Sequence, residues 1–142
     1  MPYNNPVYVI SVGKFYHRGK IIAEGYSGHG KGLNNPALVN LIAVGPIPPG
    51  LYNIDAPENH PHLGPFAMAL LPDSKNNMYG RSEFYLHGDN NYRNHSASLG
   101  CIVSSRHDRE IIDNLLDNEG IANLRVVAEV ANIPTPDTPS DG

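Results

Sequence analysis

The lone cysteine and one of the seven histidines form the part of the sequence best suited to chemistry. Cys101 lies between Gly100 and an apolar pair, and His87 ends an apolar run and precedes Gly88. The loop between them is long enough to fold back and bring the two side chains together. An ordinary thiol has a pKa of ~8.5, so it needs a nearby base to become a nucleophile at neutral pH. The pattern therefore predicts a thiolate–imidazolium pair, with Cys101 as nucleophile and His87 as base.

The glycines beside this pair predict how the backbone would assist. Gly100 has no side chain, so its amide and that of Cys101 can point at a developing oxyanion. Gly88 lets the chain turn after His87 and leaves a carbonyl that can hold the imidazole tautomer. The alternative interpretation is a cysteine packed in the core and a histidine bonded to a backbone carbonyl.

Four further side chains are candidates for substrate contacts. Arg81 would bind a carboxylate through two N–H groups, or else form a surface salt bridge. Asp89 would meet an ammonium group, or else form an Asx turn. Tyr26 belongs to a glycine-rich loop that could cover the site, and His95 lies in the loop between the base and the nucleophile.

A zinc site is an alternative use of some of these residues. His60 and His62, together with His87 and Asp89, have the side-chain types that zinc prefers. However, Pro61 separates the first two histidines in a proline-rich stretch, which is more typical of a loop. A thiol nucleophile needs no metal, so no metal and no cofactor are expected.

The elements that must position these residues are mostly short strands. Apolar and β-branched runs predict strands at 7–12, 51–54, 66–71, 84–86 and 124–130, and a hairpin over 15–23 that turns near Gly19. One helix is expected after Ser105, which forms a capping box with Asp108, and Gly120 ends it. Its apolar face consists of Ile111, Ile112, Leu115 and Leu116. The sequence thus predicts a mainly β, antiparallel sandwich or barrel-like domain with one packed helix.

Composition limits the classes of protein. The 142 residues suit one domain, and 14 glycines and 13 prolines exclude a helical fold. The net charge of −4, without a Lys/Arg-rich segment, argues against nucleic-acid binding, and no apolar run is long enough for a membrane helix. Residues 1–130 are expected to form the domain, and residues 131–142 a disordered tail rich in Pro and Asp. No secretory signal is visible, so we expect work in the cytoplasm or export by a route that reads no such signal.

Several motifs together carry a resemblance to a known family. His87-Gly88, a loop and Ser98-Leu99-Gly100-Cys101-Ile102 resemble the signature of L,D-transpeptidase catalytic domains of the YkuD type. The segment 45–54 is similar to another stretch of that family. The type VI secretion L,D-transpeptidase-like effectors are the more similar group. They share motifs at residues 26–28, 34–36, 44–50, 62–65, 80–82, 87–89 and 98–102.

The resemblance implies a fold, a reaction and partners. It implies a domain of the L,D-transpeptidase type in which Cys101 attacks the tetrapeptide stem of peptidoglycan, at the carbonyl on the L-centre of diaminopimelate. D-alanine would leave, and a thioester would form. Ser98 would lie beside the nucleophile, Gly88 would orient His87, and the amides of Gly100 and Cys101 would form the oxyanion hole. The protein would be an antibacterial toxin exported to a rival's periplasm, with an immunity protein and a secretion apparatus as partners.

Two positions favour trimming and D-amino-acid exchange over cross-linking. Leu99 and Val103 stand where the wider family carries His or Arg and Arg, respectively. Two other functions stay open from the sequence. One is a module that binds cell-wall peptides without turnover, and the other is a cysteine hydrolase with another substrate.

Overall fold

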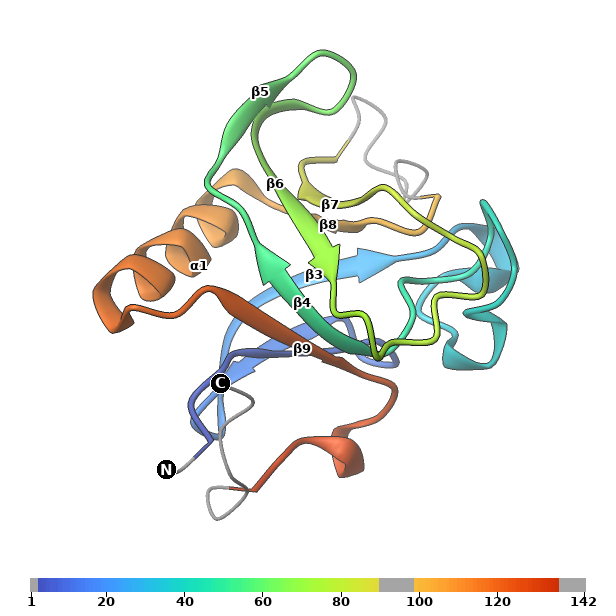
Figure 1. Cartoon of the computed structure of the whole chain (residues 1–142), viewed down its shortest axis with the longest axis horizontal. Coiled ribbons are helices and arrows are strands. Elements are labelled where there is room, and N and C mark those ends of the chain that lie inside the picture. Colours follow the sequence, from blue (N-terminus) through green and yellow to red (C-terminus); the bar gives the residue numbers. More distant parts are fainter. Residues whose placement is uncertain (1–2, 90–98, 136–142) are drawn as a thin grey trace.

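A closed β-barrel dominates the computed structural model, which describes residues 3–89 and 99–135 (Figure 1). The order around the barrel is β4 (Gly50–Ile54), β9 (Asn123–Val127), β1 (Val7–Val9), β2 (Lys14–His17), β3 (Lys20–Ser27), β8 (Ile102–Ser104), β7 (Phe84–His87) and β6 (Gly64–Pro72). One end of β6 pairs with β4 and so closes the ring, while its other end pairs with β5 (Glu58–His60). Three 3-10 turns lie in the connections, namely η1 (Gly30–Gly32), η2 (Pro36–Leu38) and η3 (Val130–Asn132).

The predicted hairpin is confirmed as β2 and β3. These strands pair antiparallel, and His17 lies opposite Lys20. Arg18 and Gly19 make the turn with φ angles of 51° and 81°, the left-handed values that a two-residue hairpin turn of type I′ requires. This hairpin leads β3 to Ser27, beside the strand that follows Cys101.

The hydrophobic core fills the barrel and continues under the helix. Alternate residues of each strand point inward, as the period of two requires. Leu86 of β7 and Ile102 of β8 are register neighbours, and neither is exposed to solvent. Other large side chains buried in the same cluster are Tyr8, Phe15, Tyr52, Met68, Leu70 and Leu124.

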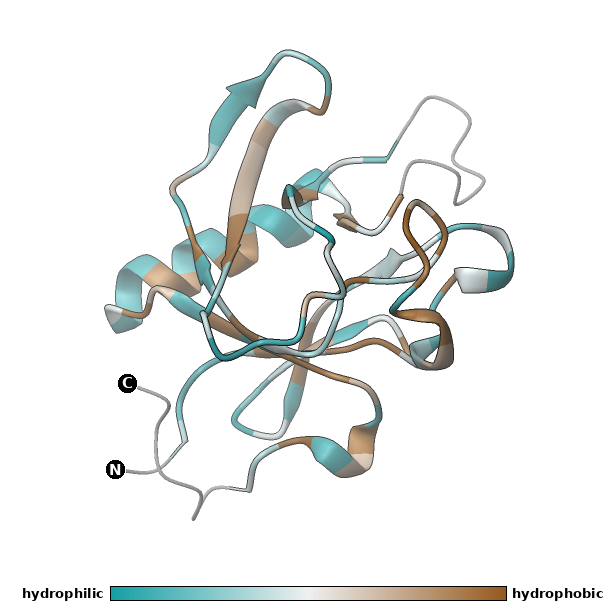
Figure 2. Ribbon diagram, turned by 45° about the vertical axis from the view of Figure 1, so that its right-hand side comes forward, coloured by the Kyte–Doolittle hydropathy of each residue, from teal (hydrophilic) through white to brown (hydrophobic). Residues whose placement is uncertain are grey.

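The predicted helix is confirmed as α1 (Arg106–Glu119). The side chain of Ser105 accepts a hydrogen bond from the Asp108 N–H at 3.0 Å, and Gly120 ends the helix with φ of 64°. Ile112 and Leu116 are buried against the barrel, and the alternation of hydrophilic and hydrophobic residues along α1 is visible in Figure 2. Within residues 3–89 and 99–135, no helix is both long and apolar enough to span a membrane.

The prediction of a mainly β, barrel-like domain with one helix is confirmed, but its antiparallel character needs correction. The fold is a closed barrel, and two of its neighbouring strand pairs, β1–β9 and β7–β8, are parallel. A parallel pair needs a connection that returns to the end at which the first strand began. Residues 88–101 connect β7 to β8, and most of them lie outside the described residues.

The expected tail does not begin at residue 131. Residues 130–132 form η3, and Ile133 packs against a second hydrophobic cluster that contains Tyr3, Val7, Val9 and Val127. The chain therefore remains part of the folded domain beyond residue 130. Residues 136–142 lie outside the described residues.

Candidate active site

The parallel pairing of β7 and β8 places His87 and Cys101 on one face of the sheet. The register sets His87 beside Val103 and Leu86 beside Ile102. Extended by one residue, it sets Cys101 beside Tyr85, which shares a face with His87 because side chains alternate along a strand. Leu86 and Ile102 point into the barrel core, so His87 and Cys101 point to the opposite face of the sheet. Both line one cavity of ≈ 660 Å³.

The walls of this cavity come from four separate parts of the chain. Ile42 and Leu99 lie on its rim and are 70% and 63% exposed, so the rim is apolar and open to solvent. His60 and His62, at the β5–β6 turn, provide polar groups on another side. A peptide could therefore reach the thiol through an opening that is apolar on one side and polar on the other.

The backbone holds the imidazole of His87 from behind. Its Nδ1 lies 2.8 Å from the carbonyl oxygen of Gly88. A carbonyl can only accept, so Nδ1 carries the proton and Nε2 is left as the basic nitrogen of the neutral ring. The contact agrees with the role predicted for the Gly88 carbonyl, and the alternative of a histidine bonded to a backbone carbonyl predicts it equally.

The pKa of His87 is lowered, mainly because the side chain is buried with only 3% of its surface exposed. The Gly88 carbonyl raises this pKa, the charge of Arg109 lowers it, Asp89 raises it, and His60 lowers it. Burial dominates because a charged imidazolium loses its hydration there. At neutral pH the ring is therefore uncharged and able to accept a proton.

The thiol of Cys101 is also held in its neutral form. Burial raises its pKa, and the Tyr85 backbone N–H and the charge of Arg81 oppose that rise. The Sγ donates to the carbonyl of Glu83 at 3.8 Å. Burial of both groups therefore favours a neutral thiol and a neutral imidazole in the resting protein, and the thiolate–imidazolium pair stays a prediction.

Two buried side chains fix the peptide planes that precede Cys101. The hydroxyl of Ser27 donates to the Gly100 carbonyl at 2.9 Å, and Arg81 Nη2 donates to the Leu99 carbonyl at 3.3 Å. In a trans peptide the N–H points away from the carbonyl of the same plane. The amides of Gly100 and Cys101 are therefore directed away from Arg81 and Ser27, respectively. Gly100 has a φ of 133°, which a residue with a side chain rarely adopts.

Sequence reasoning gave Ser27 no role in the site. Its hydroxyl also accepts from the Ile47 N–H at 2.9 Å, so it ties the segment around Pro46 to the segment that carries the thiol. Ser27 is completely buried. The only signal in the sequence was its place between Tyr26 and Gly28, within a motif shared with the effector group.

Arg81 lies near the thiol, but it does not lie on the surface as the predicted salt bridge requires. Only 7% of its surface is exposed. Its two terminal nitrogens donate to four backbone carbonyls, which leaves no pair of N–H groups for a bidentate contact with a substrate carboxylate. The surface salt bridge is therefore wrong, whereas the contact with substrate stays a prediction, since Arg81 lines the same cavity as Cys101.

Tyr26 and Asp89 are brought together in a different cavity. The Tyr26 hydroxyl donates to Asp89 Oδ1 at 2.8 Å. Both residues line a cavity of ≈ 730 Å³ that extends to Ser104 and Arg106, rather than the cavity that contains Cys101. Their predicted contact with substrate at the thiol is therefore not supported by their position. The two remaining predicted site residues, His95 and Ser98, lie outside the described residues.

The zinc alternative finds little support from the described histidines. His60 Nδ1 accepts hydrogen bonds from the N–H groups of His62 and Leu63, both at 3.1 Å, so that nitrogen is engaged within its own turn. Among residues 3–89 and 99–135, no group of three or more His, Cys, Asp or Glu side chains is placed to hold a metal ion.

Comparison with models of known protein families gives a match over most of the chain. The model of the Tlde1 domain matches residues 21–127, which include His87, Cys101 and the whole of α1. Searches of curated proteins and of solved structures give no match.

Proposed function

The chain belongs to the Tlde1 domain family, which is related to type VI secretion effectors, and on this basis we propose that it is a cysteine-dependent enzyme of peptidoglycan. The proposed activities are L,D-carboxypeptidase cleavage of tetrapeptide stems and exchange of the terminal D-amino acid. Both proceed through a thioester on Cys101. The observation that carries the proposal is the shared cavity, in which a buried histidine and the lone cysteine lie on one face of adjacent parallel strands.

The proposed reaction begins with a neutral pair of side chains. As Sγ of Cys101 attacks the carbonyl carbon on the L-centre of diaminopimelate, the thiol proton moves to Nε2 of His87. The imidazolium returns this proton to the amine of D-alanine when the C–N bond breaks, which leaves the thioester. Water then attacks, gives one proton to His87 and releases the acid, and His87 passes the proton to the departing thiolate. A D-amino acid in place of water gives exchange.

Backbone amides are proposed to stabilise the oxyanion of each addition step. The orientation of the peptide planes before Cys101 supports this role for the N–H groups of Gly100 and Cys101, because their carbonyls are fixed on the opposite side. Amides fixed before the reaction need no reorganisation when the charge develops. Because these amides would stabilise the oxyanion, we expect a measurable rate of thioester formation even though the pKa of the Cys101 thiol is raised.

The preference for trimming and exchange rests on two apolar positions. Leu99 lies on the cavity rim and Val103 is buried, so neither supplies a cationic group to a second, acceptor stem. We propose export of the protein by a type VI apparatus, action in the periplasm of a target cell, and protection of the producer by an immunity protein.

Mass spectrometry of isolated sacculi, incubated with and without a free D-amino acid, tests the proposal. The protein is expected to convert tetrapeptide stems to tripeptides and, with added D-amino acid, to exchanged tetrapeptides. Cys101→Ser and His87→Ala are expected to lower both rates on the order of 10³-fold or more. His107→Ala, which changes an exposed histidine on α1, is the matched control and should retain the rate of the unchanged protein.

The outcomes separate this function from its alternatives. Binding to sacculi without release of D-alanine, equal in the protein and in Cys101→Ser, would indicate a binding module. Inert sacculi, combined with Cys101-dependent cleavage of another peptide or ester, would indicate a cysteine hydrolase with a different substrate.

A further inference from the structure

Both glycines beside the reactive residues lie against a buried arginine. Gly100 precedes Cys101 and touches Arg81, and Gly88 follows His87 and touches Arg109. The two arginines come from distant parts of the chain, and only 7% and 5% of their surfaces are exposed. The same arrangement thus occurs twice, once behind each reactive side chain.

Arg81 joins the segment that carries the thiol to another loop. Its Nη1 donates to the carbonyls of Val39 and Pro46 at 2.6 and 2.8 Å, and its Nη2 donates to those of Gly45 and Leu99 at 2.9 and 3.3 Å. The planar guanidinium suits this task because its N–H groups form a rigid fork. The position of the Leu99–Gly100 peptide therefore depends on Arg81.

Gly100 fits this guanidinium closely. A Cβ at residue 100 would overlap Arg81 Nη2 and would lie 3.0 Å from the Phe84 ring, while the guanidinium itself stacks over that ring with 5.2 Å to its centre. Arg81 cannot move aside without losing its four carbonyl contacts. The close approach gives Gly100 a second reason to be glycine, in addition to its φ of 133°.

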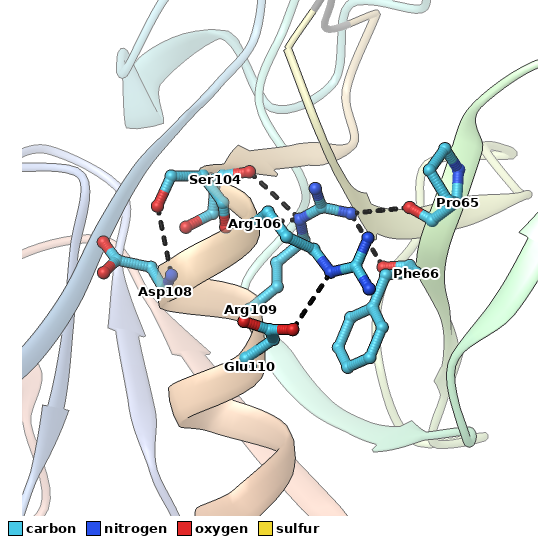
Figure 3. Close-up of polar contacts among 8 residues, drawn as sticks. Pro65, Phe66, Ser104, Arg106, Asp108, Arg109 and Glu110 are labelled. Atoms are coloured by element: carbon cyan, nitrogen blue, oxygen red, sulfur yellow. Dashed lines mark hydrogen bonds and ion pairs between the residues drawn. The ribbon is translucent and has the colours of Figure 1, made fainter.

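Arg109 joins separate backbone segments next to Gly88, the residue that follows His87. From the first turns of α1, its Nε donates to the carbonyls of Ser104 and Ser105 at 3.1 and 3.3 Å. Its Nη1 donates to those of Pro65 and Phe66 at 3.0 and 2.8 Å. Figure 3 shows the guanidinium between the end of β8 and the start of β6.

The close approach of Arg109 is the structural reason for a glycine at position 88. The φ of Gly88 is not in the left-handed region, so the backbone conformation itself does not require glycine. A Cβ at residue 88 would lie 2.8 Å from Arg109 Nη2. The missing side chain therefore lets the guanidinium approach the peptide whose carbonyl holds His87 Nδ1.

We propose that Arg81 and Arg109 are positioning residues, each of which fixes the backbone that carries one of the two reactive side chains. The inference rests on the proposed function for its consequence in catalysis. In this reading, Arg81 sets the direction of the amides before Cys101, and Arg109 sets the Gly88 carbonyl and with it the orientation of the imidazole.

The partners of the two arginines argue for this role. Within residues 3–89 and 99–135, the ion pairs involve other side chains, and both guanidinium groups donate to backbone carbonyls. A buried cation without a carboxylate partner is costly, and its desolvation lowers the pKa of both arginines. Each guanidinium instead anchors backbone carbonyls, Arg81 at the cavity that contains Cys101 and Arg109 at the other cavity, which Gly88 also lines.

Steady-state kinetics of Arg81→Lys and Arg109→Lys test the inference, with Arg18→Lys as a control on an exposed arginine that also donates to side chains. A lysine keeps the charge but cannot reach several carbonyls at once. Each buried variant is expected to lose on the order of 100-fold in kcat with KM little changed, since a small displacement of a reacting group has about this effect. Arg18→Lys should match the unchanged protein.

A pH profile distinguishes positioning from mere stabilisation. Besides Arg109, the charged groups that act on His87 are Asp89 and His60, and Arg81 acts on Cys101. Because a lysine keeps the charge, Arg109→Lys is expected to act by loosening the Gly88 carbonyl, whose contact raises the pKa of His87, and so to move the acidic limb of kcat/KM to lower pH. Withdrawal of Arg81 is expected to move the alkylation midpoint of Cys101 to higher pH. Lysine variants that melt at lower temperature but keep the kcat and both profiles would overturn the proposal.

Two further variants decide the matter if a lysine variant does not fold. Gly88→Ala and Gly100→Ala do not change the arginine side chains themselves. Each adds a methyl group that would clash with the guanidinium of Arg109 or Arg81, respectively. Folded alanine variants with reduced kcat support positioning, and folded variants with unchanged kcat refute it. If the unchanged protein releases no D-alanine, the proposed function fails, and the alkylation rate of Cys101 in the same variants still tests whether the arginines place the thiol.

Discussion

At the scale of single residues, burial favours the neutral form of both candidate catalytic side chains, Cys101 and His87. It raises the pKa of the Cys101 thiol and lowers the pKa of the His87 imidazole, because each charged form loses hydration. A permanent ion pair would require the desolvation of two charges. Proton transfer is therefore expected to accompany attack on the substrate instead of preceding it.

The pH dependence of thiol alkylation tests this neutral resting state. Iodoacetamide is expected to modify Cys101 in the folded protein with a midpoint above ~8.5, the ordinary value for a thiol. The same thiol in urea provides the reference, since the chain has only one cysteine. A midpoint in the folded protein below that of the unfolded chain would contradict the prediction and indicate a thiolate–imidazolium pair.

The lowered pKa of His87 is expected to make the thermal stability of the protein depend on pH. The unfolded chain binds a proton at this residue near pH ~6.5, whereas the folded protein binds it only at lower pH. The contribution to stability is therefore fully present above about pH 6.5 and is lost as the pH falls through the folded-state pKa. His87→Gln should flatten the dependence of Tm on pH in this acidic range, and calorimetry at several pH values measures it.

His107→Gln provides the comparison, because this histidine is exposed on α1. It should leave the slope of Tm against pH unchanged. If His87→Gln also leaves the slope unchanged, burial does not perturb this imidazole in the way described.

At the scale of elements, the start of α1 links the helix to the barrel next to the reactive pair. Ser105 caps the helix, and its carbonyl receives Nε of Arg109, the residue proposed to position Gly88. Ser104 also donates through its hydroxyl to the Glu24 carbonyl of β3 at 2.6 Å. The first turn of α1 is therefore held by side chain and backbone together.

Removal of the cap should cost stability. Ser105→Ala is expected to lower the free energy of unfolding by about 1 kcal/mol, because the Asp108 N–H loses its acceptor. Ser105→Asp retains an oxygen at this position and should restore most of the loss. Urea denaturation of the three proteins measures the difference, and equal stability of the alanine and aspartate variants would contradict a capping role.

At the scale of the whole molecule, both chain ends contribute to a second hydrophobic cluster outside the barrel. Tyr3 near the N-terminus and Ile133 beyond η3 pack with Val7, Val9 and Val127, which belong to β1 and β9. Pairing of β1 with β9 brings these segments together. The end of the described chain therefore covers the outer face of the barrel.

Truncation of one side chain in this cluster should destabilise the whole domain. Ile133→Ala is expected to cost about 1 kcal/mol, less than the ~2–5 kcal/mol typical of a fully buried isoleucine, because the side chain is only partly buried. Val130→Ala, three residues earlier and 47% exposed, is the matched control and should have little effect. Equal melting temperatures for the two variants would show that the segment after β9 does not stabilise the fold.

Local signals in the sequence were sufficient for the elements with local causes. The hairpin at Arg18-Gly19 and the helix between Ser105 and Gly120 are set by turn and capping residues that act on their immediate neighbours. The strand that ends at His87 follows from its apolar run in the same way. The pairing of Cys101 with His87 as the reactive candidates rested on residue type and on adjacent glycines, and both residues line one cavity.

Only the tertiary structure decided the features that depend on which distant segments meet. No local pattern reveals that β7 and β8 run parallel, that β6 closes the barrel against β4, or that Tyr26 and Asp89 lie in a cavity apart from the thiol. The same holds for Arg81 and Arg109, which are buried and whose carbonyl partners are up to 44 residues away in the chain. The directions in which the pKa values of Cys101 and His87 shift also depend on the fold, because desolvation is a property of the surroundings and not of the residue itself.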